Sequence, residues 1–261
     1  MIDIGVNLTN SRFDKDRDSV IARAKCAEIT AMLVTGTNIA ESHKASTLCQ
    51  KYPNYLFCTA GVHPHDADNV TSDYLEQLRA LASNNEVKAI GECGLDFNRN
   101  FSKPAQQEKV FTEQLVLASE LGLPVFLHQR DAFDKWMNIL SPFLNDLPFA
   151  ISHCFTGSES ELKQCLENDV YIGITGWICD VKRGQGLRDI VRHIPLDKLL
   201  IETDAPYLTP KNIKPRPKSS RNEPSYLPYI VNVLSECMSV SESAIIEHST
   251  NNAKLVFGLP Q

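Results

Sequence analysis

The chain has 261 residues, a hydrophobic fraction of 43% and a formal net charge of −6 at pH 7. This length is close to the roughly 250 residues of one (β/α)8 domain, and the hydrophobic content is sufficient for a large core. The negative net charge argues against a protein that bulk positive charge holds on nucleic acid, but it does not exclude a nuclease that must release its product.

The cysteines and the N-terminal segment indicate a reducing compartment. No two of the eight cysteines have the CxxC spacing of a structural zinc site, and several lie in apolar runs, where a free thiol packs as a small hydrophobic group. The opening MIDIGVNLTN carries Asp3 in its apolar run and no basic residue, unlike a signal peptide. No stretch reaches the roughly 18 apolar residues of a membrane span. We therefore expect a cytoplasmic protein that does not associate with membranes, and a monomer is the default expectation.

Short apolar runs alternate with amphipathic stretches along the whole chain. Strands are predicted to begin near Ile2, Ala31, Leu56, Val87, Pro124, Phe149, Val170 and Leu199. The steps are about 28 residues long, and one βα unit needs about 30. Helices are predicted over 13–27, 41–52, 72–82, 106–121, 133–144, 159–167, 185–193, 227–238 and 242–256. This alternation predicts an α/β fold, a single TIM barrel of the metal-dependent hydrolase type that spans residues 1–261.

Four of the apolar runs lead to a residue that can bind a metal. The runs are KAIGECGLDF (88–97), PVFLHQRD (124–131), FAISHCFTG (149–157) and LLIETDAPYL (199–208), and they supply Glu92, His128, His153 and Asp204. Buried parallel strands have such continuous apolar runs, and the catalytic groups of a TIM barrel lie at the carboxyl ends of its strands. We expect the four side chains to converge on one divalent hydrolytic metal.

Each of these residues alone has a simpler structural explanation. A single histidine after a strand is more often a hydrogen-bonded core residue than a ligand, and Glu92 alone could form a helix cap or a salt bridge. Metal binding is favoured because His128 and His153 occupy equivalent positions in successive strands. Asp204 could bind the metal or act as a general base on water. Glu202, two residues earlier on the same face, is expected to be structural.

Two further residues point to substrate contacts. His63, in GVHPH after the third strand, could protonate a leaving oxygen or contact phosphate, or it could be a loop histidine held by a backbone bond. Arg130 lies two residues after His128, where a guanidinium group could bind phosphate through two hydrogen bonds or pair with Asp131.

A stiff basic segment follows Asp204. Residues 206–224 are rich in proline, and from Lys211 to Arg221 the segment has five basic residues and no acidic one. It is predicted to be either a phosphate-binding loop, with Arg221 as a substrate contact, or a solvated surface loop. The aromatic residues that could stack a terminal base are Phe97, Phe155, Trp177 and Tyr207.

Taken together, these segments resemble the TatD-type metal-dependent DNases of the amidohydrolase-like superfamily. The ordered blocks that carry the resemblance are DIGVNLT, TGTN, TAGVHPHD, AIGECGLDFNRNFS, PVFLHQRDA, HCFTG, YIGITGW, LLIETDAPYL and SSRNEP. Each block alone is modestly specific, whereas the ordered set is highly specific and covers essentially the whole chain.

The resemblance implies a Mg²⁺-dependent 3′→5′ exonuclease that prefers single-stranded DNA, accepts RNA and acts in DNA repair or degradation; Mn²⁺ and Zn²⁺ are the alternative ions. It implies Glu92, His128 and His153 as metal ligands, Asp204 as a catalytic carboxylate at the metal, and His63 in the catalytic and substrate shell. Most of the wider family has DxHxH in strand 1. This sequence has Asp3, Gly5 and Asn7 there, which argues against a permanent two-metal site.

Two other functions remain open from the residues. A C–N bond hydrolase on the same barrel usually relies on a modified lysine in strand 4 and on the HxH pair, where this chain has Glu92 and Gly5/Asn7. A non-catalytic nucleic-acid-binding barrel is favoured by the missing strand-1 histidines and disfavoured by the metal ligands of the later strands.

Overall fold

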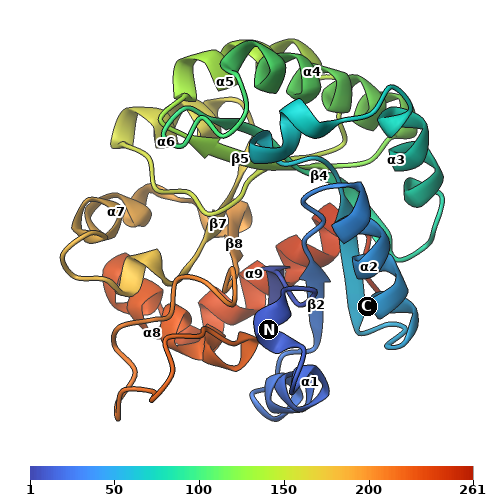
Figure 1. Cartoon of the computed structure of the whole chain (residues 1–261). Coiled ribbons are helices and arrows are strands. Elements are labelled where there is room, and N and C mark those ends of the chain that lie inside the picture. Colours follow the sequence, from blue (N-terminus) through green and yellow to red (C-terminus); the bar gives the residue numbers. More distant parts are fainter. Residues whose placement is uncertain (261) are drawn as a thin grey trace. The chain divides into compact units, whose positions relative to one another are not determined.

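The computed structural model describes residues 1–260 and divides into two compact units (Figure 1). Unit 1 contains Met1–Leu33, Cys154–Glu167 and the chain from Tyr171, and unit 2 contains Val34–His153 and Asn168–Val170. The single domain expected over residues 1–261 stays a prediction.

Unit 2 is built on four parallel strands that pair in chain order. The strands are β3 (Leu56–Ala60), β4 (Val87–Asp96), β5 (Val125–Arg130) and β6 (Ala150–Ser152). The helices are α2 (Ile39–Gln50), α3 (Tyr74–Ala82), α4 (Pro104–Leu121) and α5 (Phe133–Leu140), with 3₁₀ turns η2 (Pro64–Asn69) and η3 (Ser141–Phe143). Figure 1 shows α3, α4 and α5 beside one another over β4 and β5, which they contact.

Unit 1 contains the first and last strands. Its strands are β1 (Ile2–Val6), β2 (Ala31–Val34, whose last residue falls in unit 2), β7 (Tyr171–Ile174) and β8 (Leu199–Ile201). Its helices are α1 (Arg17–Cys26), α6 (Glu159–Glu167), α7 (Gln185–Ile190), α8 (Leu227–Met238) and α9 (Glu242–Phe257). The 3₁₀ turns are η1 (Ser11–Phe13), η4 (Gly176–Cys179), η5 (Val191–His193), η6 (Leu196–Lys198) and η7 (Pro224–Tyr226). β7 pairs with β8 in parallel, and α9 packs on β8 and β1.

The predicted elements agree with the structure except at some helix ends and at the C-terminal end of β4. All eight strands begin within one residue of the predicted position. The first helix begins at Arg17 instead of residue 13 because a separate 3₁₀ turn precedes it. The helix predicted over 133–144 ends at Leu140, since Pro142 has no N–H to donate to the helix, and a 3₁₀ turn follows.

β4 differs from the prediction in a way that matters for the site. Glu92 was expected to end this strand, but the strand continues to Asp96, and its register on β5 shifts between Gly91 and Cys93. Gly91 and Gly94 have φ values of 143° and 141°, a region open mainly to glycine. A Cβ atom on Gly94 would lie 1.9 Å from the backbone oxygen of His128. Glycine therefore permits the close approach of β4 to β5 that brings two acidic side chains to the site.

Two buried glutamines of α4 hold the ends of β3 and β4. Gln114 accepts a hydrogen bond from the Val62 N–H at 2.8 Å and donates to the Val62 carbonyl at 3.0 Å. Gln107 accepts from the Asp96 N–H at 2.9 Å and donates to the Ser102 carbonyl at 2.8 Å. These bonds satisfy backbone groups that would otherwise be buried without a partner, and they fix the segments that carry the site residues.

No helix among residues 1–260 is long and apolar enough to cross a membrane. All eight cysteines are free thiols, as expected from the sequence.

The glycine requirement of β4 can be tested by substitution. We expect Gly94→Ala to lower the free energy of unfolding by at least about 2 kcal/mol, because the new methyl group meets the His128 carbonyl at a φ that alanine rarely adopts. Gly186→Ala in α7 is the control, because its methyl group would meet nothing within 4 Å and alanine favours a helix. Urea unfolding followed by circular dichroism measures both, and equal stability of the two variants would contradict this account.

Candidate metal centre

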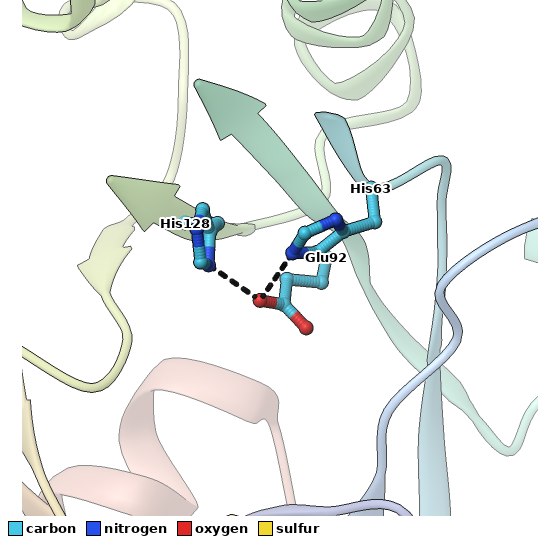
Figure 2. A group of neighbouring side chains, drawn as sticks. All are labelled: His63, Glu92 and His128. Atoms are coloured by element: carbon cyan, nitrogen blue, oxygen red, sulfur yellow. Dashed lines mark hydrogen bonds and ion pairs between the residues drawn. The ribbon is translucent and has the colours of Figure 1, made fainter. Parts of the chain in front are cut away.

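The carboxylate of Glu92 is surrounded by three imidazole groups in unit 2. Its Oε1 atom lies 2.9 Å from Nδ1 of His128, 3.4 Å from Nε2 of His63 and 3.5 Å from Nε2 of His153. Figure 2 shows the His63 and His128 rings on either side of this oxygen. One ligand atom from each of Glu92, His63 and His128 lies within 4.8 Å of the others, so the three residues form a candidate metal-binding group.

The backbone determines which nitrogen of His63 faces Glu92. His63 follows β3, its N–H donates to the Thr37 carbonyl at 2.8 Å, and its Nδ1 accepts a hydrogen bond from the His65 N–H at 3.1 Å. A neutral ring that accepts at Nδ1 carries its proton on Nε2. His63 is therefore suited to donate a hydrogen bond from Nε2 toward the centre.

His128 and His153 come from adjacent strands of the same sheet. His128 lies within β5, and His153 directly follows β6, where its N–H donates to the Leu127 carbonyl at 2.9 Å. The His153 ring packs against Phe126, with 4.7 Å between ring centroids. Both rings are thus oriented by their strands before any ligand binds.

The electrostatics of the cluster favour a positive charge at its centre. Burial raises the pKa of Glu92, but the charges of His63 and His153 and the hydrogen bond from His128 outweigh it and hold that pKa well below its usual range. Burial lowers the pKa of His63. Burial also opposes the charged form of His128, yet bonds to Asp96 and Glu92 raise its pKa overall. An ionised carboxylate surrounded by imidazole nitrogens is a donor set that suits a divalent cation.

Asp96 is a site residue that the sequence analysis missed. It is 1% exposed, and its Oδ2 lies 2.7 Å from Nε2 of His65 and 3.5 Å from Nε2 of His128. Burial raises its pKa, but the bonds from His128 and His65 lower it further than burial raises it. The sequence did carry a signal, because residues four apart on a strand share a face. A strand 4 that ends at Glu92, as predicted, leaves Asp96 outside this pattern.

Asp204 lies in unit 1, after β8. Its Oδ1 accepts a hydrogen bond from Nδ2 of Asn7 at 2.9 Å, and its N–H donates to the Gly5 carbonyl at 2.8 Å. Asn7 therefore holds the Asp204 carboxylate, and Gly5 holds its backbone. Two residues earlier, Glu202 is buried and accepts from the Cys154 N–H at 2.6 Å, consistent with its expected structural role.

Asp3 holds the segment of unit 1 that precedes Asp204. It is fully buried and accepts hydrogen bonds from the Thr203 N–H at 2.9 Å and the Thr203 hydroxyl at 2.5 Å. Burial raises the pKa of Asp3 to about 7, although the bonds from Thr203 oppose the shift. Its carboxyl group thus anchors the residue next to Asp204.

The two arginines predicted to bind substrate have different environments. Arg130 is exposed, and its guanidinium group forms no hydrogen bond or ion pair within residues 1–260. The alternative ion pair with Asp131 is not formed, and Asp131 instead accepts from Asn98 at 2.6 Å. Arg221 binds Asp16 through two bonds of 2.6 and 2.8 Å and Glu223 at 2.7 Å. The substrate role of each arginine stays a prediction.

Residues 2–258 match the family model described as TatD related DNase. The chain belongs to the TatD-related DNase family. It is 52% identical over 259 residues to the 3′-5′ ssDNA/RNA exonuclease TatD of Pectobacterium atrosepticum, covering 99% of this chain and 100% of that protein. It is also 52% identical over 260 residues to the enzyme of the same name from Erwinia billingiae, with 100% of both chains covered.

The solved structures support the same family. YjjV, a TatD homologue from Escherichia coli K12, superposes with a TM-score of 0.90 at 27% identity, covering 100% of this chain and 98% of that chain. Together with the alternation of eight strands with helices, this similarity confirms the predicted (β/α)8 barrel. The resemblance to TatD-type DNases is likewise confirmed. The assignment of individual site residues stays a prediction.

We expect Asp96→Asn to weaken metal binding about 10- to 100-fold, as is typical when the partner of a metal-binding histidine is changed. The Asp96 carboxylate lies 3.5 Å from Nε2 of His128, whose Nδ1 faces Glu92, and a neutral amide would favour this ring orientation less. Mn²⁺ titration followed by the electron paramagnetic resonance signal of the free ion measures the dissociation constant. The exposed Asp146→Asn is the control, and unchanged Mn²⁺ affinity in Asp96→Asn would rule out this role.

Proposed function

We propose that this protein is a metal-dependent 3′→5′ exonuclease that hydrolyses phosphodiester bonds of single-stranded DNA and also of RNA. The observation that carries the proposal is the buried Glu92 carboxylate with three imidazole nitrogens around one oxygen, in a chain of the TatD-related DNase family. The curated names of relatives at 52% identity over the whole chain support a nuclease, as predicted from the sequence.

Glu92, His128 and His153 would hold the ion, since their oxygen and nitrogen atoms face a common centre. The predicted ion is Mg²⁺; Mn²⁺ or Zn²⁺ are the alternatives, and imidazole ligands suit these two. Such an ion supplies Lewis-acid polarisation of a phosphate ester and lowers the pKa of water.

The remaining polar groups suggest roles in proton transfer. We assign to Asp204, whose carboxylate Asn7 orients, the acceptance of a proton from the attacking water. As the P–O3′ bond breaks, His63 donates its Nε2 proton to the leaving 3′ oxygen. The proton lost by water and the proton gained by the leaving group thus have separate carriers.

Substrate would be held by cations that have no acidic partner. Arg130 meets this condition, and so do Lys214, Arg216 and Lys218 in the basic segment within residues 1–260. By contrast, Lys211 lies 2.7 Å from Asp180, and Arg221 is paired with Asp16 and Glu223. Binding through Arg221 would therefore require it to exchange these carboxylates for phosphate.

The alternative functions are less well supported. A C–N bond hydrolase and a non-catalytic nucleic-acid-binding barrel would both leave the match to TatD exonucleases over the full length unexplained. Action in DNA repair or degradation, a cytoplasmic location and a monomeric state stay predictions.

The proposed activity is tested with a 5′-labelled single-stranded oligonucleotide and with RNA of the same sequence. With Mg²⁺ we expect a ladder that shortens from the 3′ end, no cleavage in EDTA, and at least about a 100-fold loss of rate in Glu92→Ala, because the central carboxylate is removed. Mn²⁺ and Zn²⁺ are compared at equal concentrations.

The control for Glu92→Ala is Glu247→Ala, which removes an exposed carboxylate of α9. Equal rates in the wild type and Glu92→Ala would place the activity elsewhere. Failure of the wild type to cut with any of the three ions would overturn the proposed function.

A further inference from the structure

The side chain of Phe101 is exposed to solvent close to the metal centre. Phe101 lies in the loop between β4 and α4, and 64% of its surface is exposed. Its neighbour Ser102 is 1% exposed, donates to the His65 carbonyl at 2.8 Å and accepts from the Asp68 N–H at 3.0 Å. Gln107 donates to the Ser102 carbonyl. The backbone on the C-terminal side of the ring is therefore fixed, and the ring is exposed although the loop is well anchored.

The N-terminal half of the loop is anchored as well. Oδ1 of Asp96 accepts from the N–H groups of Asn98 at 3.0 Å and Arg99 at 2.8 Å, and Asn100 donates to the Phe97 carbonyl at 2.7 Å. Hydrogen bonds at both ends of a short loop restrict its conformations. The chain thus presents Phe101 in a defined position without gaining burial from it.

Ring contacts connect Phe101 to the metal centre. The edge of His65 meets Phe101 at 4.7 Å between centroids, and the His65 and His128 centroids are 6.3 Å apart. His65 is held in this position by Asp96 at 2.7 Å. Since nucleotides repeat at about 3.4 Å along a stacked strand, these contacts span only a few nucleotides.

Two arginines of unit 2, Arg99 and Arg130, have no acidic partner within residues 1–260. The Arg99 guanidinium lies 5.9 Å from the Phe101 centroid. Arg130 is opposite Asp96 in the β4–β5 register, and its carbonyl accepts from the Phe97 N–H at 3.0 Å. Within residues 1–260 neither guanidinium forms an ion pair, so both can bind phosphate.

We propose that Phe101 stacks a nucleobase of the single strand close to the cleaved end, and that Arg99 and Arg130 bind the neighbouring phosphates. This proposal rests on the exonuclease function proposed above. Stacking on an aromatic face tolerates any base, and guanidinium groups bind the backbone, so the subsite suits a nuclease without sequence preference. If Phe101 did not stack a base, its removal would change the binding of intact and abasic strands to the same small extent.

The test combines removal of the ring with removal of the base. A set of 5′-labelled oligonucleotides carries one abasic position at successive distances from the 3′ end. In the wild type, one position should raise KM about five- to tenfold, because the base that stacks is missing. Phe101→Ala should raise KM by a similar factor on the intact strand and should lose the sensitivity to that abasic position. Phe101→Trp should behave as the wild type.

Leu255→Ala is the matched control, because it removes a side chain that is 60% exposed on α9. The same variants and oligonucleotides are compared by fluorescence anisotropy in EDTA, which reports binding independently of cleavage. If Phe101→Ala binds as tightly as the wild type and keeps the abasic sensitivity, the inference is wrong. A wild type that binds through Phe101 but does not cut would overturn only the proposed activity.

The arginines are tested through salt dependence. We expect Arg99→Gln and Arg130→Gln each to reduce the slope of log K against log salt concentration by about 0.7, the value for one phosphate contact on a single strand. Arg192→Gln, on the exposed η5 turn of unit 1, should leave the slope unchanged. A slope equal to that of the wild type in both Arg99→Gln and Arg130→Gln would exclude them as phosphate contacts.

Discussion

The organisation of unit 2 depends on keeping one buried carboxylate ionised. Removing a carboxylate from water is costly unless opposite charge or hydrogen bonds compensate, and Glu92 has three imidazoles around a single oxygen. The imidazoles come from β5 and from the segments that follow β3 and β6, so the sheet must hold these three segments in closely defined positions. The close approach of β4 and β5 at Gly91 and Gly94 meets this requirement.

The same requirement explains the polar residues buried in α4. Gln107 and Gln114 occupy positions on the core side of the helix where apolar side chains would normally pack. They instead satisfy the backbone at the ends of β4 and β3, next to Asp96 and just before His63. A buried amide that completes its hydrogen bonds fixes these segments more specifically than apolar packing would. The geometry of the metal centre thus also depends on α4, through the hydrogen bonds that Gln107 and Gln114 make to the backbone of the site segments.

The sequence predicts the scaffold better than the details of the site. Apolar runs of strand length locate all eight strands, because burial on both faces leaves a strong pattern. The pattern does not reveal that strand 4 shifts its register on strand 5 between Gly91 and Cys93 and continues past Glu92, and Asp96 was missed for this reason. Nor could it show that Arg221 pairs with Asp16, 205 positions away in the chain. An ion pair between distant residues depends on the folded structure, whereas the spacing of apolar residues reports only on the local segment.

Charge pairing resolves the apparent conflict between an acidic chain and an anionic substrate. A net charge of −6 repels nucleic acid at long range, so binding must depend on local cations whose charge is not already neutralised. In unit 1, Asp16 and Glu223 neutralise Arg221, and Asp180 neutralises Lys211. Arg99 and Arg130 in unit 2 have no acidic partner within residues 1–260, and the same holds for Lys214, Arg216 and Lys218 in unit 1. A few unpaired cations at the site, set in an otherwise repulsive surface, would hold a strand end at the site and still release the shortened product.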